Sequence, residues 1–189
     1  MYCETEHLLI RDPVLEDWRG AHSFLADPAV MRWIHLGPKP FNEEQSQKWI
    51  ADLIFYNNQQ PRDSHNCLIE ERATHQIIGW IGIGKPSPHR LEIGDLDFGY
   101  ALARTHWGKG YMTGALQAVL AFAFKELDAN RVFAICEIQN RGSFRVMEKA
   151  GMKRQQQFIE YDTDKARDKT MFLYTLSKVE WQVNTLPPP

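Results

Sequence analysis

A glycine turn between a strand-like run and a long helical pattern is the most informative chemical feature of this chain. Gly108 and Gly110 bracket Lys109 directly after the apolar run 97–103, and the helical pattern begins at Tyr111. Glycine lets the backbone approach a ligand closely, and the first N–H groups of a helix have no partners within it. The helix dipole adds partial positive charge at the same point. The pattern therefore predicts an anion site that would accept a phosphate or a pyrophosphate.

Two better-known glycine motifs fit this turn less well. A P-loop has four residues between its glycines and then Lys-Ser/Thr, whereas here only Lys109 intervenes and Tyr111 follows. A dinucleotide-binding fingerprint needs a third glycine and a later acidic residue, which Gly114 and Asp128 approach, but no series of βαβ units surrounds them. A tight turn that starts a helix without any ligand is the remaining alternative.

Composition favours a single domain without an electrostatic footprint for nucleic acid. The chain has 189 residues, of which 43% are hydrophobic, and a formal net charge of −2. We expect one domain over residues 1–182 and a disordered tail at 183–189.

The 3 cysteines lack a CxxC pair and the 7 histidines lack a His-x-x-x-His spacing, which predicts no metal site and reduced thiols in the cytoplasm. A polar, acidic start unlike a signal peptide and the lack of an apolar stretch of about 20 residues predict no membrane partner.

The hydrophobic periodicity predicts strands alternating with helices. Strands are expected at 7–11, 66–70, 76–83, 91–102, 131–137, 155–161 and 170–176. Helices are expected at 14–25, after an Asp27 cap, after an Asn42 cap with Gln45 in capping-box position, at 111–127 and at 144–150. This order predicts an α/β (α+β) fold, with a mixed, mostly antiparallel sheet of about seven strands and helices on both faces.

Four separate blocks resemble the GNAT N-acetyltransferases, and more closely their RimJ/RimL-type branch. Residues 97–102 and 107–112 resemble the core of the family, and 140–152 looks like its Asn-x-x-Ser-x-x-x-x-Glu-Lys-x-Gly-Phe segment. The opening 5–11 and the ending 167–181 are similar to the branch. The resemblance covers nearly the whole chain, and it implies the GNAT fold and acetyl-CoA as cosubstrate.

The chain departs from the general acyl-CoA motif of the family at two places. Aligned on Gly110, it has Trp107 and Met112 where the motif Gln/Arg-x-x-Gly-x-Gly/Ala has its first and last defined residues. The RimJ/RimL-type branch commonly has Trp-Gly-Lys-Gly-Tyr here, so Trp107 agrees with the branch. Gly114 stands where that branch often has Glu, which puts any role of that carboxylate in doubt and weakens the helix slightly.

The resemblance implies how acetyl-CoA would be held. Backbone N–H groups of residues 108–113 would bind the pyrophosphate, which agrees with the predicted anion site, and Asn140 would orient the cosubstrate or its own turn. The pantetheine arm would pair with the backbone of Ala101 and Leu102, on the strand where the family opens its sheet. The full set of expected cosubstrate-binding residues is Ala101, Leu102, Trp107, Gly108, Lys109, Gly110, Tyr111, Met112, Thr113, Asn140, Ser143, Phe144 and Met147.

The implied reaction is attack of a neutral amine on the thioester, without a covalent enzyme intermediate. It requires removal of a proton from the ammonium, stabilisation of the oxyanion and protonation of the thiolate. Ser143 is expected beside the CoA sulfur, with helix capping as its other possible role. Asp97 and Glu160 are the candidate bases, each with a simpler reading as an exposed or paired carboxylate, and a water relay would make a base unnecessary. Cys136 is expected in the core.

The acceptor is the least defined part of the prediction. Trp33, His35 and Trp49 lie in the N-terminal helical region, which commonly forms the acceptor wall of this fold, and Tyr174 could line the same site. Packing explains Trp33, His35 and Trp49 equally well, and an aromatic residue in a central strand, such as Tyr174, is more often a core residue. The acceptor is a protein N-terminus, as in ribosomal-protein acetylation, or a small amine such as an antibiotic or a polyamine. Use of another acyl-CoA and a catalytically silent CoA-binding module are the alternatives, and a homodimer is expected from the branch.

Overall fold

A single mixed sheet organises the molecule. The computed structural model describes residues 1–34, 40–162 and 167–185. Within them the strands are β1 (Tyr2–Glu4), β2 (Leu8–Arg11), β3 (Ser64–Glu71), β4 (Gln76–Gly84), β5 (Leu96–Leu102), β6 (Arg131–Glu137), β7 (Lys153–Asp162) and β8 (Arg167–Ser177). They form an eight-stranded sheet in the order β1-β2-β3-β4-β5-β6-β8-β7.

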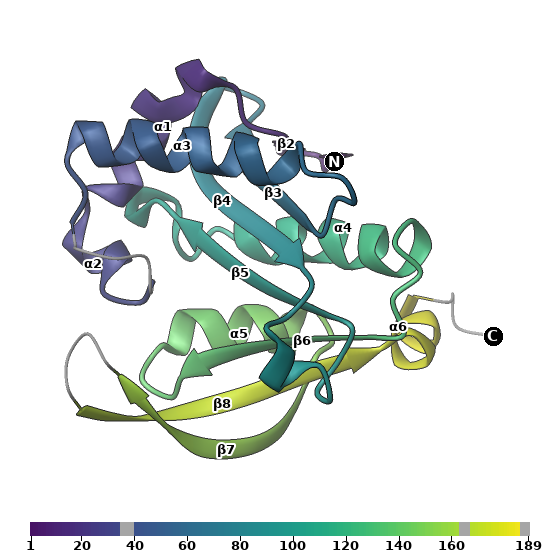
Figure 1. Ribbon diagram of the computed structural model, residues 1–189. Coiled ribbons are helices and arrows are strands. Elements are labelled where there is room, and N and C mark those ends of the chain that lie inside the picture. The colour runs from purple at the N-terminus through teal and green to yellow at the C-terminus, as the bar shows by residue number, and fades with distance from the viewer. Residues whose placement is uncertain (35–39, 163–166, 186–189) are drawn as a thin grey trace.

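Helices cover both faces of this sheet (Figure 1). The α-helices are α1 (Trp18–Leu25), α2 (Pro28–Met31), α3 (Glu43–Asn57), α4 (Tyr111–Lys125), α5 (Arg141–Lys149) and α6 (Lys178–Thr185), and the short 3-10 turns are η1 (Leu15–Asp17), η2 (Pro88–Arg90) and η3 (Arg104–His106). The predicted fold class is thereby confirmed. No helix within the described residues combines the length and the apolar character that crossing a bilayer requires.

The sheet separates two hydrophobic cores. One core lies under α1 and α3 and contains Phe24 and Ile50, both fully buried. The other lies under α4 and α5 and contains Val119, Met147 and Tyr174. Side chains alternate across a strand, so successive residues of β5 face different cores. The face on which a β5 side chain lies therefore determines the face on which it could contact a ligand.

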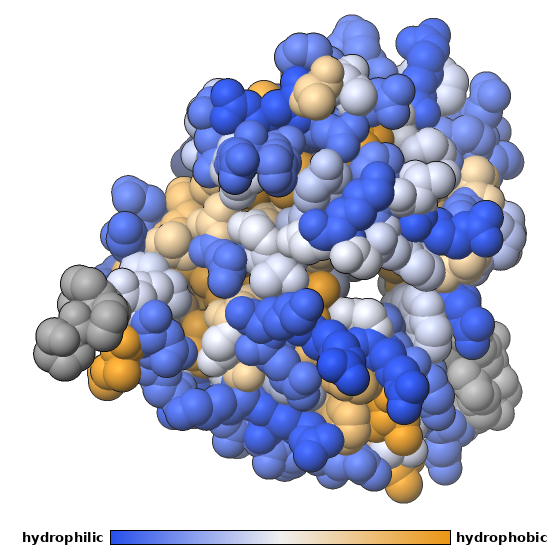
Figure 2. Space-filling view, turned by 180° about the vertical axis from the view of Figure 1, so that it is seen from behind, coloured by the Kyte–Doolittle hydropathy of each residue, from blue (hydrophilic) through white to orange (hydrophobic). Residues whose placement is uncertain are grey.

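The sheet opens between β5 and β6. Every other neighbouring pair is antiparallel, whereas β5 and β6 are parallel and pair only at Leu96 with Val132 and at Asp97 with Phe133. Beyond Asp97 the two strands diverge (Figure 1). Seen from behind, the molecule has two lobes, with an opening between them on the side where these strands end (Figure 2). The divergence creates a gap beside the backbone of β5, the strand at which the family resemblance implied that the sheet opens.

The structure corrects several predicted elements. The sheet has eight strands because the short polar segment 2–4 pairs with β2, which its composition did not indicate. The predicted helix 14–25 starts as the 3-10 turn η1, where the Asp17 carboxylate accepts hydrogen bonds from the Val14 N–H and from Arg11. The predicted strand 91–102 forms only from Leu96, because the backbone turns at 91–95.

The C-terminal helix α6 was not predicted, although a local signal for it exists. Ser177 and Glu180 form a reciprocal pair, in which the Glu180 N–H donates to Ser177 Oγ and the Ser177 N–H donates to Glu180 Oε2. This is the capping-box arrangement Ser-x-x-Glu. The helix continues to Thr185, past the expected domain end at residue 182, and the rest of the predicted tail, 186–189, lies outside the described residues.

Candidate functional site

The glycine turn adopts the backbone conformation that favours glycine. Gly108 has φ 78° and Gly110 has φ 85°, both in the left-handed region that other L-residues avoid. Gly110 is the N-cap of α4, and a Cβ added at either glycine would meet no atom within 4 Å. The turn is exposed, so the free N–H groups at the start of α4 open onto solvent. This geometry suits an anion, as the sequence predicted.

Two side-chain contacts fix the turn in place. The indole N–H of Trp107 donates to the Leu102 carbonyl at 2.7 Å, although the ring is 44% exposed. The Tyr111 hydroxyl donates to Glu71 Oε1 at 2.9 Å and so ties the start of α4 to the end of β3. One lone pair of the Leu102 carbonyl is therefore already in use, which the prediction of Leu102 as a cosubstrate partner did not foresee. The exposed Lys109 ammonium lies 6.0 Å from the centre of the Tyr111 ring.

Asn140 rather than Ser143 caps α5. The Asn140 side-chain oxygen accepts the Ser143 N–H at 3.1 Å, and Ser143 stands in the first turn of the helix. Helix capping, the other possible role considered for Ser143, is therefore carried by its neighbour. This leaves the Ser143 hydroxyl available for contacts outside the helix.

The Ser143 hydroxyl lies between a phenol and a thiol. Tyr100 on β5 places its hydroxyl 2.9 Å from the Ser143 carbonyl oxygen and 3.0 Å from Ser143 Oγ. Ser143 also acts on the Cys136 thiol of β6, where it opposes the rise in the pKa of that thiol. Burial raises the pKa of Cys136 to about 11, and the residue is only 6% exposed, so its thiol stays protonated at neutral pH. Tyr100, which the sequence analysis did not single out, is the closest side-chain partner of Ser143.

Arg90 connects the two candidate bases. Arg90 Nη2 in η2 pairs with Glu160 Oε1 on β7, and the positive charge of Arg90 also acts on Asp97. Burial raises the pKa of Asp97, and the field of Arg90 partly opposes that rise. Asp97 stands at the last pair of the β5–β6 ladder, where the strands begin to separate. Glu160 fits the paired-carboxylate alternative, whereas Asp97 lies at the opening with a pKa shifted toward that of a general base.

Several predicted residues prove to be core residues. Met147 is 0% exposed and Met112 is 5% exposed, both among core side chains, so only the backbone N–H of Met112 faces the turn. Phe144 is partly buried and packs edge-on against Phe172 at 5.9 Å between ring centres. Tyr174 is 0% exposed and donates to Glu148 at 2.8 Å, which favours the packing alternative over a role in lining the acceptor site.

The remaining predicted residues come from separate parts of the chain. Trp49 is 8% exposed and packs edge-on against Trp80, while Trp33 is partly exposed beneath the guanidinium of Arg32. His35 lies outside the described residues. Ala101 is buried, and its carbonyl oxygen would lie 2.5 Å from a Cβ on Gly79, so its backbone is closely packed against β4. Thr113 is partly exposed in the first turn of α4.

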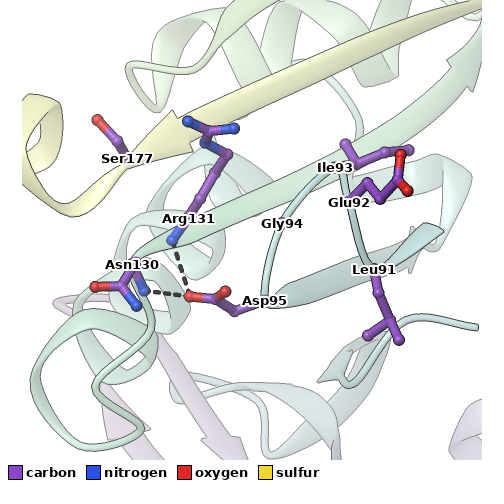
Figure 3. A pocket seen from close by; sticks show the side chains of 8 residues that line it. All are labelled: Leu91, Glu92, Ile93, Gly94, Asp95, Asn130, Arg131 and Ser177. Atoms are coloured by element: carbon purple, nitrogen blue, oxygen red, sulfur yellow. Dashed lines mark hydrogen bonds between the residues drawn. The ribbon is translucent and has the colours of Figure 1, made fainter. Parts of the chain in front are cut away.

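A shallow pocket of about 210 Å³ lies at the opposite, paired end of β5 and β6. It is lined by Leu91, Glu92, Ile93, Gly94, Asp95, Asn130, Arg131 and Ser177 (Figure 3). The Asp95 carboxylate accepts the backbone N–H groups of Asn130 and Arg131, the latter at 3.2 Å, and this fixes the turn that shortens β5. No predicted site residue contributes to this pocket, which is therefore separate from the candidate site.

The sequence of this chain is similar to that of known acetyltransferases. Residues 7–153 match the sequence profile of an acetyltransferase (GNAT) domain. The uncharacterized N-acetyltransferase YnaD of Bacillus subtilis strain 168 is 31% identical over 156 residues, which are 82% of this chain and 84% of the relative.

Solved structures show the same architecture. An acetyltransferase of the GNAT family from Bacillus anthracis is 27% identical and superposes with a TM-score of 0.79 over 95% of this chain and 99% of its own. A ribosomal-protein alanine acetyltransferase from Vibrio fischeri, 18% identical, superposes with a TM-score of 0.77 over 96% and 98% of the two chains. At that identity the second likeness concerns the fold.

Proposed function

This chain is a member of the GNAT acetyltransferase family, and we propose that it transfers the acetyl group of acetyl-CoA to a primary amine by direct attack in a ternary complex. One arrangement carries the proposal. The left-handed turn Gly108–Gly110 follows β5 closely, and β5 separates from β6 beyond Asp97, next to Ser143 on α5. A pyrophosphate at the turn and an extended arm in the opening would bring a thioester to the Ser143 side of the gap.

The residues of the chain fit this cosubstrate. The exposed turn offers backbone N–H groups and space, because a Cβ at Gly108, Gly110 or Gly114 would meet no neighbour within 4 Å. The arm of CoA contains amide groups, which can pair with strand backbone beside the opening as a neighbouring strand would. The Leu102 carbonyl oxygen already accepts the indole N–H of Trp107, so it would accept an amide N–H of the arm as a second hydrogen bond.

In the proposed reaction the amine nitrogen bonds to the thioester carbon, and the C–S bond breaks with its electron pair on sulfur. Asp97 accepts the proton that the ammonium must lose, directly or through water, because burial has raised its pKa toward a useful range. Ser143 donates a hydrogen bond to the sulfur as negative charge develops there. The nitrogen loses a second proton as the amide forms, and this proton neutralises the thiolate, while the first passes from Asp97 to solvent. The products are therefore an amide, CoA and one proton.

We keep two acceptor classes, a protein N-terminus and a small amine. The fold likeness to a ribosomal-protein alanine acetyltransferase supports the first, and Trp33 would contribute to the acceptor wall in either case. The expected homodimer stays a prediction, which light scattering on the purified protein would test.

Thermal-shift measurements with acetyl-CoA, succinyl-CoA and CoA test the cosubstrate. We expect the largest stabilisation with acetyl-CoA, because a ligand that binds only the folded state raises its stability. The lack of a shift with all three would overturn the proposal, and a preference for succinyl-CoA would replace acetyl transfer with another acyl transfer.

A thiol-release assay across peptides and small amines tests turnover and identifies the acceptor. Release with one acceptor class supports transfer, whereas binding of acetyl-CoA without release over a broad panel would favour a silent CoA-binding module. We expect Ser143→Ala to lower kcat by about tenfold or more, with a much smaller change in acetyl-CoA affinity.

A further inference from the structure

A pair of hydroxyl groups crosses the opening between β5 and β6. Tyr100 belongs to β5, and Ser143 to the first turn of α5, 43 residues further along the chain. The Tyr100 hydroxyl lies 2.9 Å from the Ser143 carbonyl oxygen and 3.0 Å from Ser143 Oγ. Because backbone pairing between β5 and β6 ends at Asp97, this contact joins the two sides of the gap where the strands have already separated.

The Tyr100 hydroxyl contacts two oxygens of Ser143. It donates to the Ser143 carbonyl, and its own oxygen can accept the Ser143 hydroxyl proton. The Ser143 proton can turn from the Tyr100 oxygen to a substrate atom while the bond from Tyr100 to the carbonyl stays in place. Tyr100 thus restricts the position of the Ser143 side chain and leaves its hydroxyl able to donate.

We infer that Tyr100 is a positioning residue for acyl transfer: its hydroxyl donates to the Ser143 carbonyl oxygen, lies against Ser143 Oγ, and so fixes the Ser143 side chain beside the sulfur that leaves the thioester. The inference rests on the proposed function, in which Ser143 lies beside that sulfur. Tyr100 does not touch the reacting atoms itself. It acts through Ser143, and it gives up no proton, because the proton that ends on sulfur is the one lost by the attacking nitrogen.

The surroundings of Tyr100 suit a fixed hydrogen-bond donor. Its ring stacks on Phe98 at 6.1 Å between centres and packs against the core under α4 and α5. Burial raises the pKa of Tyr100 well above its usual range, so the phenol stays protonated at neutral pH. A buried phenolate is disfavoured, which is the reason to assign Tyr100 orientation rather than proton transfer.

The chain contains a matched control in Tyr174. It faces the same core, is fully buried, and donates its hydroxyl to Glu148 Oε1 at 2.8 Å. Tyr100→Phe and Tyr174→Phe each remove one hydroxyl and keep the ring, so each variant loses the hydrogen bonds of one phenol. Only the first variant alters Ser143.

The test measures kcat, the KM for acetyl-CoA and the thermal midpoint for the wild type, both Tyr→Phe variants, Ser143→Ala and the double variant Tyr100→Phe/Ser143→Ala. We expect Tyr100→Phe to lower kcat by about tenfold while KM changes by less than about twofold. Tyr174→Phe should lower the thermal midpoint to a similar extent and keep kcat within about twofold. The double variant should be no slower than Ser143→Ala alone, because Tyr100 acts only through that hydroxyl.

Three results would overturn the inference. These are wild-type turnover in Tyr100→Phe, equal loss of kcat in both Tyr→Phe variants, and a double variant whose loss is the product of the single losses. Each of them occurs with an active wild-type enzyme, so it rejects the role of Tyr100 and leaves acetyl transfer standing. A wild-type protein that neither binds acetyl-CoA nor releases CoA rejects the proposed function, and the inference with it.

Discussion

The turn at the start of α4 and the cluster around Ser143 would hold two parts of one ligand by different means. The turn offers backbone N–H groups, is exposed, and depends on the left-handed conformation of Gly108 and Gly110. The cluster offers the side chains of Tyr100, Ser143 and Cys136, which come from three elements and are largely enclosed. Changes at the turn should therefore alter binding, whereas changes around Ser143 and Asp97 should alter the chemical step.

The largest effect is expected at Asp97, on the chemical side of this comparison. Asp97→Asn should lower kcat by about a hundredfold and leave acetyl-CoA affinity nearly unchanged, because a general base is lost and no anion contact is touched. In the wild type, activity should rise with pH as Asp97 loses its proton, and the variant should lack this rise. Glu160→Gln is the matched variant, with a smaller expected loss because Glu160 is held by Arg90. A larger loss in Glu160→Gln would exchange the two assignments.

The same substitution has an expected effect on stability, whose sign follows from the pKa. Burial raises the pKa of Asp97 in the folded protein above its ordinary value of 3.8, so the folded state disfavours its charge. The stability that the protonated form provides is complete below pH 3.8 and is lost as the pH rises through the folded pKa. Asp97→Asn should therefore raise the free energy of unfolding at neutral pH, where Asp97 is charged in the wild type, but not below pH 3.8, where it is protonated. Chemical denaturation at two pH values measures this, and an equal effect at both would contradict the cause assigned here.

The second effect concerns the turn. Gly110→Ala forces a Cβ into the left-handed region, at a cost of about 1–2 kcal/mol, and distorts the N–H groups that would meet the pyrophosphate. We expect the Kd for acetyl-CoA, measured by calorimetry, to rise about tenfold, with kcat at saturating cosubstrate nearly unchanged.

Gly114→Ala provides the control within α4. Its added Cβ also meets no atom within 4 Å, but its φ is not positive, so the helix should gain stability, by up to about 1 kcal/mol. The Kd should stay within about twofold. Equal weakening by both substitutions would mean that any Cβ obstructs the ligand, and that the conformation of the turn is not the cause.

The two regions also differ in how far the sequence could predict them. The turn is local: two glycines before a helical pattern predict its conformation, just as Asn42 and Gln45 predict the start of α3, where the capping box forms as expected. The partner of Ser143 is not local, because Tyr100 and Ser143 are 43 residues apart and meet only through the packing of β5 against α5.

The surroundings of the candidate bases depend on long-range packing in the same way. Arg90 and Glu160 are 70 residues apart and meet because η2 reaches across to β7. No periodicity or spacing rule relates positions this distant. The sequence therefore identified the two carboxylates as candidate bases, but it did not identify Arg90 as the cation that acts on both. Met147 shows the converse, because the resemblance assigned it to the cosubstrate and the structure buries it fully in the core. Tyr174 is fully buried as well, in agreement with the packing alternative for an aromatic residue of a central strand.

The smallest effect is expected at Cys136, and it tests whether the Ser143 cluster acts by hydrogen bonding alone. Burial raises the pKa of this thiol to about 11, which makes it a poor nucleophile at neutral pH. Cys136→Ala should therefore lower kcat by no more than about twofold and stability by about 1 kcal/mol. Native alkylation should modify the partly exposed Cys3 before Cys136. An acetyl adduct on Cys136 in the mass spectrum of the enzyme with acetyl-CoA alone would replace direct attack by a covalent route, and Ser143 would then serve the thiol rather than the leaving sulfur.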